Sequence, residues 1–207
     1  MVQKLDHIVY AVPDLEATMN WFEEQTGVRP VFGGYHTTQG TKNALLKLGD
    51  QCYLEFLAAD EKNTAITPPR WMGIDLIAQS RITRWAVQST DLQKDSKILK
   101  SYDSKMGNTA GGQRKMTNGK LLTWELTMPL AEPEVEILPF LIDWQRSESH
   151  PTDSLEQHCH LVELKLTHPN PDSLQEVLGQ LNLNINISKG AVNINAVIQS
   201  PKGLLVL

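Results

Sequence analysis

Apolar and polar positions in the first 60 residues follow a strand pattern, then a helix pattern, then a strand pattern again. Residues 5–12 are rich in β-branched and aromatic side chains, as strands are. After Asp14, a residue type that caps helices, apolar side chains recur at helical spacing until Gly27. Three short strand-like runs follow, at residues 29–33, 43–48 and 51–57. The pattern therefore predicts a β-α-β-β-β unit.

The same order returns in the second part of the chain. Asp91 repeats the break at Asp14, and Asn118-Gly119 is a turn signal between two strand-like runs. A segment at residues 70–78 reads as a helix that bridges the two units. The predicted elements of the second unit are a strand at 83–89, a helix at 92–105, a hairpin at 113–116 and 120–127, and a strand at 135–144.

A third and weaker copy of this order follows a polar stretch at residues 147–157. Its predicted elements are a strand at 162–167, a helix at 173–181, and short strands at 183–187, 191–199 and 204–207. Such repetition indicates one structural unit used more than once. The sequence therefore predicts an α+β protein with a first βαβββ module at 1–60, a linker helix at 61–81, a second βαβββ module at 82–146 and a partial third module at 158–207.

Composition and charge narrow the function classes. The chain has 207 residues and a net charge of −5, with no long basic run, so we expect no nucleic-acid partner. No window approaches the roughly 20 apolar residues of a membrane span, so we expect no membrane partner. Cys52 and Cys159 are too few for a disulfide framework and fit a reducing compartment. We therefore expect a cytoplasmic protein with a small-molecule ligand, and a homodimer is one assembly open to it.

Several short segments resemble the glyoxalase-like proteins of the vicinal oxygen chelate superfamily. The resemblance covers about residues 4–151 and begins with the first strand. The matching segments are DHIVYAVPDL at 6–15, GYH at 34–36, GTKN at 40–43, YLE at 53–55, PFLIDW at 139–144 and His150-Pro151.

This resemblance implies a fold and an activity. In that superfamily paired βαβββ modules curl into a half-open barrel, and a divalent metal is often held by a His on the first strand and a Glu on the fourth. His7 and Glu55 occupy these two positions here, which implies a zinc, iron, manganese or nickel site. The expected function is a metal-dependent lyase, isomerase or hydrolase that acts on a small oxygenated or anionic metabolite. The superfamily also contains metal-free binding and sequestering proteins, which is the alternative function.

The strand pattern by itself supports a polar pair inside the fold. His7 shares a strand face with Val9, and Glu55 shares one with Leu57, because side chains alternate along a strand. A carboxylate on an apolar face is costly unless it is paired or bound to a metal. The sequence leaves three arrangements open for Glu55, which are a metal ligand, a hydrogen bond with His7, and an ion pair with an arginine.

The second unit departs from the metal-binding pattern. Alignment of the strand breaks places Arg84 at the position of His7, and Phe140 or Ile142 where a Glu is expected. A guanidinium stays protonated and binds no metal. We therefore expect at most one metal-binding half, with His36 or His150 as a third ligand or as the catalytic proton carrier.

Three further residues are candidates for binding the substrate. Arg84 and Arg114 carry guanidinium groups that can hold a carboxylate through two hydrogen bonds, or can form surface ion pairs of little consequence. Asn43 lies with His36 in a loop-to-strand segment, where binding groups are common and where Asn can also serve turn geometry. His150 either covers the mouth of the cavity or begins a linker.

Overall fold

The computed structural model describes residues 3–115 and 119–207. The elements are β1 (Lys4–Ala11), α1 (Leu15–Thr26), β2 (Val31–His36), β3 (Thr41–Gly49), β4 (Cys52–Ala59), the 3-10 helix η1 (Trp71–Leu76), β5 (Arg81–Gln88), α2 (Leu92–Tyr102), β6 (Thr109–Lys115), β7 (Leu121–Thr127), β8 (Phe140–Asp143), the 3-10 helix η2 (Pro151–Ser154), β9 (His160–His168), α3 (Asp172–Gln180), β10 (Ile187–Lys189), β11 (Asn193–Ser200) and β12 (Gly203–Val206).

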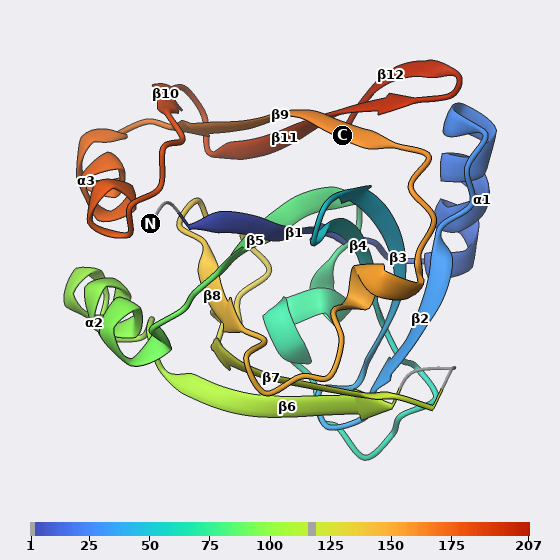
Figure 1. The fold of residues 1–207 in the computed structure, drawn as a ribbon, viewed down its shortest axis with the longest axis horizontal. Helices are drawn as coiled ribbons and strands as arrows, with labels where there is room; N and C mark the ends of the chain where they lie inside the picture. The colour runs from blue at the N-terminus through green and yellow to red at the C-terminus, as the bar shows by residue number, and fades with distance from the viewer. Residues whose placement is uncertain (1–2, 116–118) are drawn as a thin grey trace.

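Two copies of one strand arrangement form the main sheet. Its strand order is β2-β3-β4-β1-β5-β8-β7-β6. In each copy the first strand pairs in parallel with the last, β1 with β4 and β5 with β8, and the copies join where β1 and β5 run antiparallel. The sheet curls until it is nearly closed, so the predicted α+β fold with repeated βαβββ modules in a half-open barrel is confirmed (Figure 1).

The ends of the first helix follow from its capping residues. The Asp14 side chain accepts a hydrogen bond from the backbone N–H of Ala17 at 3.0 Å, which satisfies an amide that the helix leaves unpaired. Gly27 ends α1 in the left-handed conformation, with φ 76°, and its N–H reaches the carbonyl of Glu23. The sequence therefore predicts both ends of this helix correctly.

The curled sheet separates two apolar cores. The outer core lies between the sheet and the helices and includes Ile8, Phe22 and Phe56. The inner core fills the closed part of the barrel and includes Val9 and Leu57. Because successive residues of β1 belong to different cores, the alternation in the sequence corresponds to the two faces of one strand.

The third unit forms a sheet of its own, with order β10-β9-β11-β12, that lies across the outside of the barrel (Figure 1). Its inward side chains, such as Leu166, Ile194 and Ile198, join the outer core. Its pairing differs from that of the first two modules, because β9 pairs in parallel with the second strand, β10, and antiparallel with β11.

Two predicted strands are shorter than their patterns indicated. The strand predicted at residues 135–144 begins at Phe140, because backbone carbonyls before it bind the side chains of Arg84 and Trp85. The strand predicted at residues 183–187 begins only at Ile187, because the Gln175 side chain bonds to the backbone of Ile185 and Ile187.

The connections between elements show two more differences. The bridge predicted as a helix at residues 70–78 is the 3-10 helix η1, with Met72 and Gly73 in left-handed conformations. Strands β6 and β7 pair antiparallel as predicted, although Asn118 of the turn signal lies outside the described residues. Within residues 3–115 and 119–207, none of the helices is both long and apolar enough to span a bilayer.

Candidate functional site

A small cavity of about 40 Å³ lies inside the barrel and collects most of the predicted site residues. Its walls are apolar on the side of the second module, where Leu126, Phe140 and Ile142 line it. The polar lining comes mainly from the first module and from β6. The polar side chains that line it include His7, His36, Asn43, Glu55, Trp71 and Arg114.

His7 is held in one orientation by its neighbours. Its ring stacks on Tyr53 with ring centroids 4.7 Å apart and meets the edge of Phe140 at 5.2 Å. Its Nδ1 lies 2.6 Å from Oδ1 of Asp6. An ionised carboxylate only accepts hydrogen bonds, so Nδ1 carries a hydrogen whether His7 is neutral or charged. His7 can therefore gain or lose a proton only at Nε2.

Asp6 is a site residue that the sequence reasoning missed. Its carboxylate is fully buried and also accepts hydrogen bonds from Gln88 Nε2 at 3.0 Å, Trp144 Nε1 at 2.9 Å and His150 Nε2 at 3.1 Å. Burial by itself raises the pKa of Asp6, but hydrogen bonds from His150 and His7 outweigh it and hold the pKa well below its usual value. Asp6 is therefore a buried anion that joins β1 to residues far away in the chain.

A β-bulge explains why strand alternation did not reveal Asp6. The pairing of β1 with β5 shifts register between Leu5 and His7. Such a shift interrupts strict alternation and re-aims side chains. Asp6 and His7 can then meet although they are neighbours in one strand. The available signal was an acidic residue next to a buried His at the start of a strand.

Glu55 faces His7 across the cavity. Its Oε2 lies 3.8 Å from His7 Nε2, and both side chains are about 95% buried or more. Its other oxygen, Oε1, accepts a hydrogen bond from Asn43 Nδ2 at 2.6 Å. A distance of 3.8 Å is too long for a hydrogen bond. The pair therefore leaves one nitrogen and one oxygen facing each other, each able to accept a proton.

Arg114 reaches the site from the opposite edge of the sheet. It lies on β6, and its Nη1 donates to Asn43 Oδ1 at 3.1 Å. A Cβ added to Gly33 on β2 would lie 2.9 Å from Arg114 Nη1 and 2.4 Å from Asn43 Oδ1. Glycine at position 33 thus lets Arg114 cross the gap between the two edge strands. Asn43 transmits this contact to Glu55.

His36 stands beside this group at the entrance to the inner cavity. Its Nδ1 lies 2.9 Å from Thr41 Oγ1, and its Nε2 lies 3.5 Å from Asn43 Nδ2. Burial lowers the pKa of His36, the nearby Glu55 opposes this, and Arg114 adds to the lowering. His36 is therefore a neutral imidazole at pH 7.

Acidification from pH 7 to pH 5 is expected to destabilise the wild-type protein more than the variant His36→Gln. The folded pKa lies below the ordinary value of 6.5, so the unfolded chain takes up the proton first as pH falls. The contribution of neutral His36 is complete above about pH 6.5 and declines toward the folded pKa. Urea unfolding at pH 7, 6 and 5 measures this, and parallel pH dependences of the two proteins would contradict it.

His150 contacts Asp6 rather than the cavity. Its Nδ1 accepts from the backbone N–H of Thr152 at 3.3 Å, so its Nε2 carries the hydrogen that is given to Asp6. Both ring nitrogens are thereby occupied, and the next residue, Pro151, lines the cavity in its place. His150 therefore lies next to the cavity wall and is bonded to Asp6, and its role in the site stays a prediction.

Arg84 lies apart from the other predicted site residues. It is buried and shares its strand face with Ala86, but its guanidinium binds a loop at residues 130–136. Its donors reach the carbonyls of Leu130, Glu132 and Glu134, and its Nε lies 2.8 Å from Glu136 Oε2. These groups occupy the guanidinium, and Arg84 does not line the cavity. The structure brings together His7, Glu55, His36, Asn43 and Arg114.

The donor set at the cavity does not fit a divalent metal. His7 Nε2 and Glu55 Oε2 are suitable atoms, and the bond from His7 Nδ1 to a carboxylate is the usual support for a His ligand. Catalytic zinc sites use three protein ligands, however. Over residues 3–115 and 119–207, no three His, Cys, Asp or Glu side chains are placed to hold an ion.

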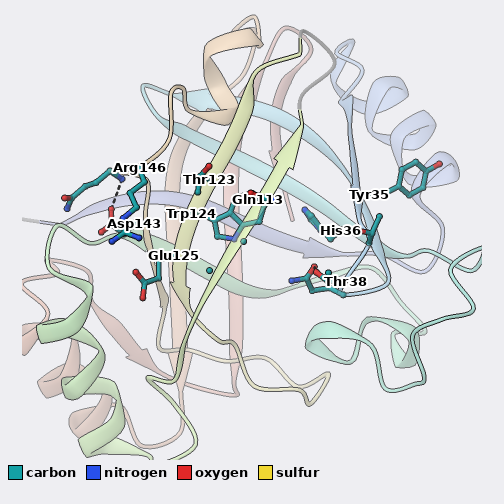
Figure 2. Close-up of a pocket in the computed structure, with 14 residues that line it drawn as sticks. Tyr35, His36, Thr38, Gln113, Thr123, Trp124, Glu125, Asp143 and Arg146 are labelled. Carbon is teal, nitrogen blue, oxygen red and sulfur yellow. Dashed lines mark hydrogen bonds between the residues drawn. The ribbon is translucent and has the colours of Figure 1, made fainter.

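A larger cavity of about 830 Å³ adjoins the inner one. His36 and Trp124 line both. Figure 2 shows His36, Tyr35 and Thr38 on one side of the larger cavity and Glu125, Asp143 and Arg146 on the other, with Trp124 and Gln113 between them. The site therefore consists of a small polar cavity and a wide outer chamber that meet at two aromatic rings.

Comparison with known proteins identifies the family and the fold. A family model described as a glyoxalase-like domain matches residues 5–181. No curated protein matches the chain. A solved structure of a hypothetical protein from Staphylococcus aureus is similar in fold, with a TM-score of 0.65, 16% identity, and coverage of 93% of this chain and 88% of that chain. Methylmalonyl-CoA epimerase from Mycobacterium tuberculosis gives a TM-score of 0.42 at 20% identity, covering 67% of this chain and 86% of that chain.

Proposed function

The chain belongs to the glyoxalase-like domain family of the vicinal oxygen chelate superfamily, and we propose that it binds a small oxygenated anion in its inner cavity and transfers a proton on it through His7 and Glu55. The ligand would be a metabolite with a carboxylate or similar group next to a carbon or oxygen that carries the mobile proton. This is the lyase and isomerase type of chemistry.

One observation carries the proposal. His7 Nε2 and Glu55 Oε2 face each other 3.8 Å apart, buried in the barrel. The remaining polar atoms of both side chains are already bonded, to Asp6 and to Asn43. Two buried proton acceptors that face each other repel unless a proton or a donor group lies between them. A ligand with an acidic hydrogen supplies that group.

Arg114 supports the anionic character of the ligand. Among the described residues, no carboxylate lies within 4.0 Å of its guanidinium, which donates a hydrogen bond to the neutral amide of Asn43. A partly buried cation without a counter-ion favours a negatively charged ligand. When a base removes a proton next to an oxygen, negative charge develops on that oxygen, and a nearby guanidinium stabilises it.

The second candidate function is binding without chemistry. The wall formed by Leu126, Phe140 and Ile142 favours it, because the second module supplies apolar contact where a reactive group would otherwise stand. A sequestering protein would use the same cavity and the same Arg114. The cytoplasmic location stays a prediction, supported by the two free cysteines, Cys52 and Cys159. A homodimer also stays a prediction.

Glu55→Gln separates the two functions. Wild-type protein in D₂O is expected to exchange the carbon-bound hydrogens of pyruvate or a related 2-oxo acid, followed by proton NMR. The variant should bind the same compound and exchange its hydrogens about 100-fold more slowly, because a glutamine amide is no base. Binding by both proteins without exchange by either would favour sequestration.

A metal analysis of the same two proteins, purified without a His-tag, tests whether the cavity binds a divalent ion. We expect no divalent ion bound in stoichiometric amount and no change in Tm when zinc or manganese is added. If the wild-type protein binds one divalent ion and Glu55→Gln does not, the proposal that the site works through its side chains alone is contradicted.

A further inference from the structure

Trp71 brings an unused hydrogen-bond donor to the inner cavity. It lines the cavity from η1, the segment that connects the two barrel modules. Its indole Nε1 is buried, and among the described residues it has no hydrogen-bond partner. The buried indoles of Trp85 and Trp144 differ, because they donate to Ile137 O at 2.8 Å and to Asp6 Oδ2 at 2.9 Å. An unpaired buried donor costs free energy, so such an atom calls for an explanation.

The backbone that follows Trp71 is held in an unfavourable conformation. Met72 has φ 56° and ψ 20°, and Gly73 has φ 59° and ψ 28°. A left-handed conformation is costly for a residue with a side chain, and such residues gather at ligand sites. Gly73 is enclosed as well, since a Cβ there would lie 2.8 Å from Pro133 N. Gly73 therefore allows the close approach of η1 to the backbone around Pro133.

Trp71 and Arg114 both lie close to His36. The rings of His36 and Trp71 meet edge to face, with centroids 5.9 Å apart. Asn43 lies next to both His36, at 3.5 Å, and Arg114, at 3.1 Å. Trp71 and Arg114 thus bring two N–H donors, the indole and the guanidinium, to the cavity that also holds the two acceptors of His7 and Glu55.

We infer that the indole N–H of Trp71 binds an oxygen of the ligand carboxylate, together with Arg114. This inference rests on the proposed function and adds the chemical class of the ligand head group, which is a small carboxylate. One oxygen accepts from Trp71 and the other from Arg114. The rest of the ligand then faces His7 and Glu55.

Acetate is the probe, because it is a bare carboxylate of the size of the inner cavity. The indole N–H signals of wild-type protein labelled with ¹⁵N are followed by NMR during an acetate titration. We expect the Trp71 signal to move and the Trp85 signal, whose donor is already bonded, to stay. We expect Trp71→Phe to bind acetate about tenfold more weakly than the wild type. Trp21→Phe, on the exposed face of α1, should bind acetate as the wild type does.

The thermal stability of Trp71→Phe distinguishes a tryptophan that binds the ligand from one that only stabilises the fold. Trp71→Phe keeps the aromatic ring and removes a donor that satisfies nothing in the protein, so its Tm without acetate should change by less than about 4 °C. Weaker acetate binding with this small change supports the inference. Equal acetate affinity in Trp71→Phe, or a Trp71 signal that stays still while acetate binds, overturns it and leaves the proposed function standing. If the wild type binds no acetate, both this inference and the anionic character of the ligand are overturned. Proton exchange by Glu55 is tested by a separate experiment that does not involve Trp71.

Discussion

Replacement of Asp6 by asparagine is expected to lower the free energy of unfolding by about 3–5 kcal/mol, the range for removal of one member of a buried charged network. Asp6 is fully buried and accepts hydrogen bonds from His7, His150, Trp144 and Gln88. An amide has one acceptor oxygen and brings two hydrogens of its own. Several of these donors would then be left unpaired inside the protein. Urea unfolding at pH 7 measures the loss.

The matched control for Asp6→Asn is Asp14→Asn. Asp14 also accepts a hydrogen bond through its carboxylate, but it caps α1 at the surface, where asparagine serves as well. The two variants remove the same charge, so a similar loss in both would mean that the buried network contributes little. The folded pKa of Asp6 is depressed, so its contribution is present above the unfolded value of 3.8 and is lost as pH falls toward the folded pKa. The difference between wild type and Asp6→Asn should therefore shrink in acid.

Arg84→Met is expected to destabilise the fold by a similar amount, about 3–5 kcal/mol. It would leave the Glu136 carboxylate without its cation and the carbonyls of the loop at 130–136 without their donors. Arg84→Lys should recover little, because an ammonium group cannot replace the planar fork of a guanidinium. Thermal and urea unfolding of both variants measure these losses.

Arg81 offers a control for Arg84 on the same strand. Its exposed guanidinium donates to Pro133 O at 3.0 Å, so Arg81→Met should change the free energy of unfolding by about 0.5 kcal/mol or less. The double variant Arg84→Met with Glu136→Leu should be more stable than Arg84→Met alone, because it removes the unpaired carboxylate. Weaker acetate binding in a fully stable Arg84→Met protein would instead return Arg84 to the ligand site.

The strand and helix order is largely a local property, and the sequence predicts it well. Asp14 and Gly27 mark the ends of α1 because capping depends on residues within one turn. The strand predicted at 135–144 is too long because the carbonyls of Glu134 and Ile137 accept hydrogen bonds from the side chains of Arg84 and Trp85, about 50 residues earlier in the chain. Pattern reasoning sees apolar residues in both halves and has no access to these distant partners.

The sequence likewise indicated some of the site residues and gave no sign of others. Strand alternation and the family resemblance indicated His7 and Glu55 as one buried pair, and the structure places them face to face. They gave no sign of Asp6, because a bulge at residues 5–7 interrupts the alternation on which the reasoning depends. Neither the pattern nor the resemblance singles out Trp71, because aromatic residues usually fill cores.

The sequence by itself determined the repeated modules and the ends of α1, because these depend on local periodicity and on residue type, and it indicated His7 and Glu55 through the family resemblance. Only the tertiary structure decided which charged groups face the ligand. Arg84 and Arg114 are equivalent in the sequence, yet one is bound by loop carbonyls and the other crosses Gly33 to Asn43. The physical reason is that a guanidinium takes its role from the acceptors around it, and closure of the barrel brings those acceptors from distant parts of the chain.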